Sequence, residues 1–218
     1  MKKSVKRWIA ISLGFITSLV VSYCIGTFQP NWMVLEELKA EASAQMVKDY
    51  NSLGLEKPSI EYSNNNEFVT EVNRCIQWHN LSLEPNKRIP REIIIAMAVL
   101  ETGYGTSRFA LEGNNLFGIR TWDPDTPQLK AKGNPDAEWG VKSYETKCDS
   151  VMDMIYTVNT HHAYEGYRKE RTKQGHSVNI DRLIEELHKW STNEKYVDLV
   201  KSKVKDITRI LKSSNESI

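Results

Sequence analysis

The sequence lacks an excess of charge of either sign. Its 218 residues include 29 Lys and Arg against 28 Asp and Glu, so the formal net charge is only +1. Proteins that hold nucleic acid through bulk charge carry a basic excess. We therefore expect no nucleic-acid partner. The length allows one domain of ordinary size with extensions, and no internal repeat is evident.

The N-terminal region also lacks acidic residues, because none precedes Glu36. An uncharged segment, residues 8–28, follows a basic flank and is long enough to cross a membrane, which takes about 20 helical residues. The flank consists of Lys2, Lys3, Lys6 and Arg7. Basic flanks stay cytoplasmic. We predict that residues 1–30 form an uncleaved, single-pass signal-anchor, with the rest of the chain on the outer side of the membrane.

Two other fates of this segment stay open. A cleaved signal peptide usually has a shorter apolar region and a small-x-small cleavage site, which is not evident here. Lipid attachment at Cys24 is the second alternative. Tyr23 is bulky where a lipoprotein signal has Gly, Ala or Ser, which disfavours it.

Cysteine is scarce, and only Cys75 and Cys148 fall outside the apolar segment. The apolar spacing around Cys75 places it on the buried face of a helix. An oxidising compartment permits a disulfide between the two, but the sequence does not establish one. His161 and His162 are adjacent rather than i, i+4 on a helix. With no Cys/His cluster of zinc-ligand spacing, we expect neither a metal nor another cofactor.

The remaining chain predicts a linker followed by one largely helical domain. Residues 31–65 include an amphipathic helix, 32–50, and then Gly-, Pro- and Asn-containing turns, so we expect a stalk. The alternative is a first helix packed into the domain. For residues 66–213 we expect a mainly α (α+β) fold, with helices near 68–79, after 150, along 180–190 and over 197–211. Residues 121–142 lack helical periodicity and predict a long loop or a small β-hairpin lobe.

Glu101 ends an otherwise apolar helix. Pro90 begins it, Glu92 suits the positive N-terminal end of its dipole, and Gly103 and Gly105 end it. Glu101 then lies in the last turn, where the dipole and the apolar surroundings both disfavour a charged carboxylate. We predict a raised pKa, as a general acid requires. The alternative is an exposed helix-end glutamate with no function.

Two motifs in this region resemble glycoside hydrolase family 73, the bacterial β-N-acetylglucosaminidases, and in particular its Bax-type branch. Residues 101–118 read E-T-G-Y-G-T-S-R-F-A-L-E-G-N-N-L-F-G, and residues 159–164 read N-T-H-H-A-Y, with His162 in place of the branch's proline. The resemblance spans about residues 66–205. It implies a lysozyme-like fold in which Glu101 is the general acid. It also implies that Tyr104 borders the cleft and that Asn115 and Phe117 line the groove beside the acid.

The resemblance has two departures. The family pattern Y-[AS]-T-D-P-x-Y is here W-S-T-N-E-K-Y, residues 190–196, so Trp190 replaces a tyrosine used in or near the active site. Trp190 retains a stacking face but has no phenolic hydroxyl, whereas Tyr196 matches the second tyrosine, as a binding or a core residue. Some members carry a second acid in the β lobe. Asp136 and Glu138 are the candidates here, with ordinary loop charges as the alternative.

These observations favour a membrane-anchored endo-β-N-acetylglucosaminidase that hydrolyses β-1,4 bonds of peptidoglycan or a related glycan. The resemblance to bacterial enzymes implies a bacterial inner membrane, with the catalytic domain facing the periplasm. A lytic transglycosylase is one alternative. Such enzymes carry a Gly-Leu-Met-Gln-type segment where this chain has Asn-Leu-Phe-Gly-Ile, residues 115–119, which favours hydrolysis. The other alternative is a glycan-binding protein that has lost catalysis, and Trp190 supports it. The oligomeric state stays open.

Overall fold

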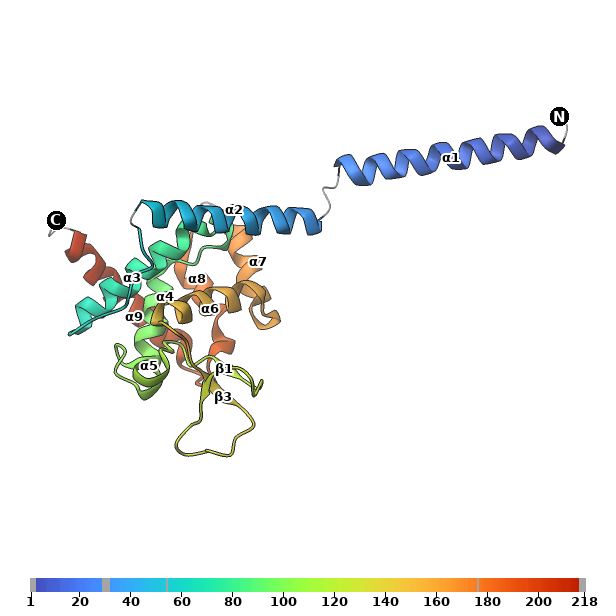
Figure 1. Cartoon of the computed structure of the whole chain (residues 1–218). Coiled ribbons are helices and arrows are strands. Elements are labelled where there is room, and N and C mark those ends of the chain that lie inside the picture. The colour runs from blue at the N-terminus through green and yellow to red at the C-terminus, as the bar shows by residue number, and fades with distance from the viewer. Residues whose placement is uncertain (1–2, 29–31, 54, 176, 216–218) are drawn as a thin grey trace. The chain divides into compact units, whose positions relative to one another are not determined.

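Figure 1 shows the computed structural model of the chain, which describes residues 3–28, 32–53, 55–175 and 177–215. The chain divides into two compact units, Met1–Glu56 and Lys57–Ile218. Each unit is described by itself below. The Cys24 side chain, and with it the question of lipid attachment there, lies outside the described part of the chain.

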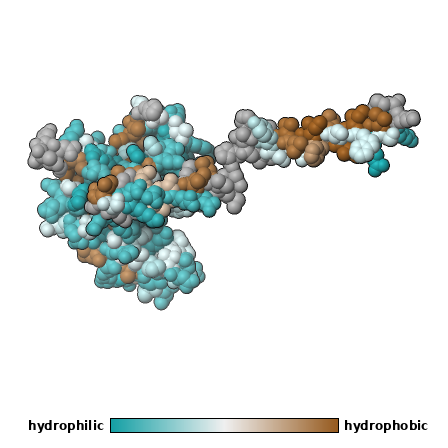
Figure 2. Space-filling model, turned by 45° about the horizontal axis from the view of Figure 1, so that its top comes forward, coloured by the Kyte–Doolittle hydropathy of each residue, from teal (hydrophilic) through white to brown (hydrophobic). Residues whose placement is uncertain are grey.

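The first unit contains two helices, α1 (Lys3–Phe28) and α2 (Trp32–Ser52). The segment Lys3–Tyr23 of α1 is long and apolar enough to cross a membrane, and its large side chains are exposed, as at Trp8 (70%) and Phe15 (67%). Figure 2 shows this apolar surface in brown along the helix. An exposed apolar surface of this kind is unfavourable in water. The helix is consistent with a membrane anchor or a signal sequence.

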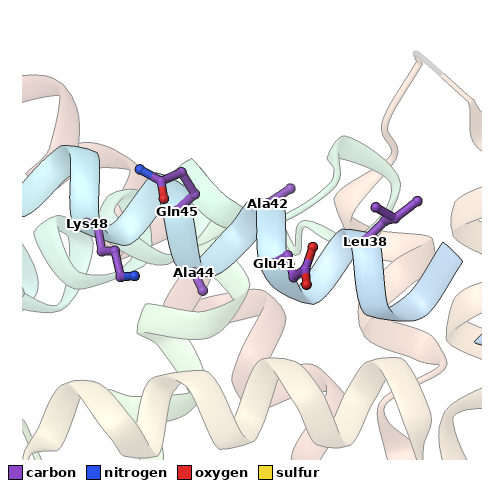
Figure 3. A pocket seen from close by; sticks show the side chains of 6 residues that line it. All are labelled: Leu38, Glu41, Ala42, Ala44, Gln45 and Lys48. Carbon is purple, nitrogen blue, oxygen red and sulfur yellow. The ribbon is translucent and has the colours of Figure 1, made fainter. Parts of the chain in front are cut away.

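Helix α2 carries exposed apolar side chains, including Leu35, Leu38 and Met46. A shallow hollow runs along it (Figure 3). Its lining consists of Leu38, Glu41, Ala42, Ala44, Gln45 and Lys48. Glu41 and Lys48 are the only charged residues in this lining, so it contains no cluster of titratable groups. The role of α2 as a stalk stays a prediction.

The second unit is built around α4 (Arg91–Thr102), which lies at its centre (Figure 1). Every residue from Ile93 to Val99 is buried, so the helix is enclosed on all sides by apolar contacts. Helix α4 packs against α9 (Tyr196–Asn215) and α3 (Asn65–Ser82), and α3 packs against α6 (Lys147–Thr160). These four helices supply most of the core.

Shorter helices complete the unit. They are η1 (Pro85–Lys87), α5 (Arg108–Gly113), η2 (His162–Tyr164), α7 (Glu165–Gln174), α8 (Ile180–Glu185) and η3 (His188–Trp190). The apolar pattern over 180–190 predicted one helical face, but α8 ends at Glu185 and η3 begins separately. The Leu187 N–H bonds to the Ile184 carbonyl, an i→i+3 contact that tightens the chain into 3₁₀ geometry.

The segment 121–142 contains most of a small antiparallel sheet. Its strands are β1 (Arg120–Thr121), β2 (Gln128–Leu129) and β3 (Gly140–Lys142), in the order β1-β3-β2. Arg120 pairs with Val141, and Gln128 with Lys142. The prediction of a mainly α fold with a small β lobe is therefore confirmed.

Cys75 and Cys148 form a disulfide that joins α3 to the first turn of α6, with their Cα atoms 5.7 Å apart. This answers the question that the sequence left open. Thr146 caps α6 through a reciprocal capping box with Asp149. The cross-link therefore connects two well-ordered helices.

Residues 57–65, which we placed in the stalk, belong to the second unit. Lys57 forms an ion pair with Asp149 (2.8 Å), and Ile60 is only 3% exposed within the core. The Tyr62 hydroxyl donates to the Gly105 carbonyl (2.8 Å). The compact unit therefore begins earlier than residue 66, and the assignment of functions to the three segments stays a prediction.

Gly105→Ala tests the turn that follows Glu101. Gly105 has φ +78°, and a Cβ there would overlap the Tyr62 ring and lie 2.8 Å from Phe68 Cε2. We expect a loss of about 2–4 kcal/mol in the free energy of unfolding, from overpacking and left-handed backbone strain. Urea denaturation measures it.

Gly133→Ala is the matched control, because nothing lies within 4 Å of the added Cβ and its φ is not in the left-handed region. We expect a change within about 0.5 kcal/mol. Equal losses in the two variants would contradict the packing of Tyr62 and Phe68 on this turn.

Candidate active site

Glu101 is the penultimate residue of α4, at the point where the chain leaves the core. Gly103 adopts the left-handed conformation (φ +59°), and its N–H bonds to the Val99 carbonyl at 2.8 Å. The Thr102 hydroxyl donates to the Ala98 carbonyl (2.6 Å) and accepts from the Gly105 N–H (2.8 Å). The predicted helix end is confirmed, and the turn holds Glu101 in one orientation.

Tyr104, the predicted cleft residue, has a left-handed backbone (φ +61°), which a residue with a Cβ rarely adopts. Such a conformation costs about 1–2 kcal/mol and persists only where neighbours enforce it. The Tyr104 ring packs edge-on against Phe68 (6.2 Å between centroids), and Lys203 Nζ lies 5.9 Å from its centroid. Tyr104 is half-buried, so part of its surface remains available to a ligand.

Asn115 organises the second motif from within the protein, since it is only 1% exposed. Its amide nitrogen donates to the carbonyls of Ile119 (3.1 Å) and Lys142 (2.9 Å), and its oxygen accepts from the Phe117 N–H (3.0 Å). These bonds tie the turn to β3. They bring Gly118 beside the acid, where an added Cβ would lie 3.7 Å from Glu101 Oε2.

The electrostatics of Glu101 favour a protonated carboxyl group. Burial raises its pKa, as the sequence predicted, and the Tyr196 hydroxyl opposes that rise in part. Tyr196 begins α9 and is 5% exposed. Its hydroxyl interacts electrostatically with the Glu101 carboxyl and makes no standard hydrogen bond among the described residues. Burial and the Glu101 charge raise the pKa of Tyr196.

A row of aromatic rings lies near Tyr196. Trp190 contacts Phe117 edge-on (6.5 Å between centroids) and Tyr164 at a tilt (5.6 Å), and Tyr164 in turn lies 6.0 Å from His161. Phe117 is buried, Trp190 is half-buried and His161 is exposed. Trp190 therefore keeps the packing that an aromatic ring provides at this position.

Tyr164 is a site residue that the sequence analysis did not identify. It is 7% exposed, burial raises its pKa to about 12, and it contributes to the raised pKa of Tyr196. The signal was present in the motif N-T-H-H-A-Y, whose last residue it is. The structure brings a second phenol to the neighbourhood of Tyr196 even though Trp190 has none.

A hollow of about 340 Å³ reaches Tyr196 from the segment between η3 and α9. It is lined by His188, Ser191, Thr192, Asn193, Glu194, Tyr196 and Val197. Hydroxyl and amide groups of this kind suit a polar, hydrogen-bonding ligand. Glu194 adds an exposed carboxylate that the sequence analysis did not consider.

Asp136 and Glu138, the predicted second acids, are exposed on the loop between β2 and β3. Within residues 3–28, 32–53, 55–175 and 177–215, no described interaction joins either carboxylate to Glu101, whose pKa responds to burial and to Tyr196. A catalytic role for either residue stays a prediction.

The structure also assembles a cluster with the donor types of a metal site. Cys75, His79 and Cys148 are all buried, and one ligand atom from each lies within 4.8 Å of the others. The sequence did not indicate this cluster, because Cys148 lies 73 residues from Cys75 in the chain. The i, i+4 spacing of Cys75 and His79 on α3 was the available signal.

Comparisons with known proteins identify a family for this chain. The family model Glucosaminidase, described as mannosyl-glycoprotein endo-beta-N-acetylglucosaminidase, matches residues 80–209. Protein bax of Escherichia coli (strain K12) is 27% identical over 196 residues, covering 87% of this chain and 64% of that protein. The chain thus spans less than two thirds of this relative's length.

Two solved structures are similar in part. One is the catalytic domain of the autolysin Auto from Listeria monocytogenes, with a TM-score of 0.49, 14% identity, and coverage of 76% of this chain and 96% of that one. The other is a type VI secretion system effector–immunity complex from Pseudomonas protegens, with a TM-score of 0.45, 16% identity, and coverage of 67% and 92%. The family model covers more than half of the sequence, and so the chain belongs to the glucosaminidase family of glycoside hydrolases.

Proposed function

We propose that this protein is a membrane-anchored endo-β-N-acetylglucosaminidase that hydrolyses β-1,4 bonds of peptidoglycan or a related glycan, with Glu101 as the general acid. The observation that carries the proposal is the half-buried Glu101 carboxyl, whose pKa is raised by burial in a chain of the glucosaminidase family. A carboxyl group that stays protonated near neutral pH can donate a proton to a leaving oxygen.

Glu101 protonates the glycosidic oxygen as positive charge develops on the sugar ring. Water then attacks directly with the help of a distant base, or the acetamido group of the substrate assists. Burial favours the protonated acid before the transfer, whereas the Tyr196 hydroxyl favours the carboxylate that the transfer leaves behind.

In this proposal the glycan binds to the surface around Glu101 and Tyr196. The Trp190 and Tyr104 rings offer faces for stacking on sugar rings, and Ser191, Thr192 and Asn193 offer polar groups in the hollow that reaches Tyr196. Phe117 and Asn115 support this surface from the core. The exposed apolar helix α1 holds the domain at the inner membrane, with the glycan on the periplasmic side.

Glu101→Gln tests the general acid. The amide keeps the shape of the side chain but has no acidic proton, so turnover of peptidoglycan should fall by at least about 100-fold. The release of reducing ends from purified sacculi measures it. Glu92→Gln, at the other end of the same helix, is the matched control and should retain activity, because Glu92 lies in the first turn of α4.

Retained hydrolysis in Glu101→Gln would contradict the assignment. Mass spectrometry of the products separates the reactions, since hydrolysis leaves a reducing N-acetylglucosamine end and a lytic transglycosylase leaves an anhydromuramic end. A wild-type chain that binds sacculi but releases no sugar ends would instead be a glycan-binding protein.

Tyr196→Phe tests the partner of the acid. The Tyr196 hydroxyl lowers the pKa of Glu101, so its removal should raise that pKa further. Activity requires the protonated acid and declines as pH rises through the pKa. The alkaline limb of the kcat/KM profile should therefore move to higher pH in the variant. A uniform loss of activity with an unmoved limb would indicate a purely structural role for Tyr196.

A further inference from the structure

We propose that Cys75, His79 and Cys148 form a second site, which binds one Cu(I) ion when the Cys75–Cys148 disulfide is reduced. The cluster includes none of the groups proposed for glycan cleavage, so the site is separate from that chemistry. It joins the middle of α3 to the first turn of α6.

The first argument is geometric. His79 Nε2 lies 3.4 Å from Cys148 Sγ, and one ligand atom from each of the three residues falls within 4.8 Å of the others. Metal–sulfur bonds of about 2.3 Å and metal–nitrogen bonds of about 2.0 Å place ligand atoms about 3.5–4 Å apart. Once the S–S bond is broken, side-chain rotation can separate the two sulfurs to about 3.5–4 Å. The distance from His79 Nε2 to Cys148 Sγ is already close to this value.

The second argument is the donor set. Two thiolates and one imidazole form a soft set that favours Cu(I) or Zn²⁺ over hard cations. Structural Zn²⁺ takes four ligands, and these three buried residues are the only His, Cys, Asp or Glu that the described chain brings to this cluster. Cu(I) is satisfied by the three. Burial of both sulfurs, at 0% exposure, would also protect the ion from water and oxidant.

The third argument concerns His79 itself. Its Nε2–H now donates to the Cys148 carbonyl at 2.9 Å, which directs that nitrogen at the sulfur pair. Binding requires the other tautomer, with the proton on Nδ1 and the Nε2 lone pair on the metal. A disulfide needs no imidazole beside it, whereas a three-ligand metal site does.

The chemistry balances with a thiol reductant. A dithiol gives two electrons and two protons to the disulfide, which becomes two thiols while the dithiol becomes a disulfide. Cu(I) then displaces both thiol protons to solvent and binds the two thiolates and His79. The reverse exchange with the oxidised dithiol returns the two electrons to it, releases the ion and restores the cross-link.

The experiment uses the full chain in detergent, reduced with a phosphine and titrated anaerobically with the Cu(I)–bicinchoninate complex. We expect one Cu(I) per chain and an ultraviolet thiolate-to-copper band. The disulfide form should take no Cu(I) from the probe, and Zn²⁺ should bind more weakly than Cu(I). Circular dichroism of the reduced chain should show the native helix content.

Variants test the ligands. Cys75→Ser combined with Cys148→Ser should abolish the binding. His79→Gln keeps a donor for the Cys148 carbonyl but should weaken the affinity by at least about 10–100-fold, the cost of losing a supporting group at a metal site. Cys24→Ser and His162→Gln are the matched controls and should bind as the wild type does.

Unchanged affinity in His79→Gln, Cu(I) uptake that depends on Cys24, stronger binding of Zn²⁺, or a reduced chain that loses its fold would each overturn the proposal. Glycan cleavage by the disulfide form is independent of all these outcomes.

Discussion

The burial of α4 is the constraint on which the site depends. Residues Ile93–Val99 are enclosed by α3, α9 and the rest of the core, so neither the position nor the rotation of this helix can change without opening the core. Glu101 inherits that rigidity, because it lies in the last turn before the chain reaches the surface. The same enclosure desolvates its carboxyl group and raises its pKa. Position and acidity therefore have one physical origin.

Two irregular segments next to α4 form the surroundings of Glu101. The turn of Gly103, Tyr104 and Gly105 is held from outside by Tyr62, which comes from residues that the sequence analysis had placed in a linker. The turn after Asn115 is held from inside, by amide bonds to the backbone at Ile119 and at Lys142. Both segments use left-handed backbone positions, which only surrounding contacts sustain. Glu101 thus lies between two turns that side chains hold in place, one by Tyr62 and one by Asn115.

Local patterns predicted the parts of this fold that local forces control. The apolar run before Glu101, with Pro90 before it and Gly103 after it, identified α4 and its end. The absence of helical periodicity over 121–142 indicated a long loop or a small β-hairpin lobe, and the structure has the β lobe. The apolar pattern over 180–190 predicted one helical face, and this prediction is wrong, because apolar spacing cannot show that the chain tightens into a 3₁₀ turn between α8 and η3. Tyr164 was missed because its motif carries no indication of which distant residues it meets.

The sequence by itself determined α4, Glu101 at its end, the apolar N-terminal segment and the two motifs of the glucosaminidase family. Each of these depends on residues that are close together in the chain. Tertiary structure decided which groups surround Glu101. Burial in the core and the Tyr196 hydroxyl from α9 act on the pKa of the carboxyl in opposite directions, while Trp190 of η3 packs against Tyr164 of η2. It also decided that Cys75 meets Cys148 across a sequence separation of 73 residues. Desolvation and side-chain contact are properties of the folded core, so no local pattern could specify them.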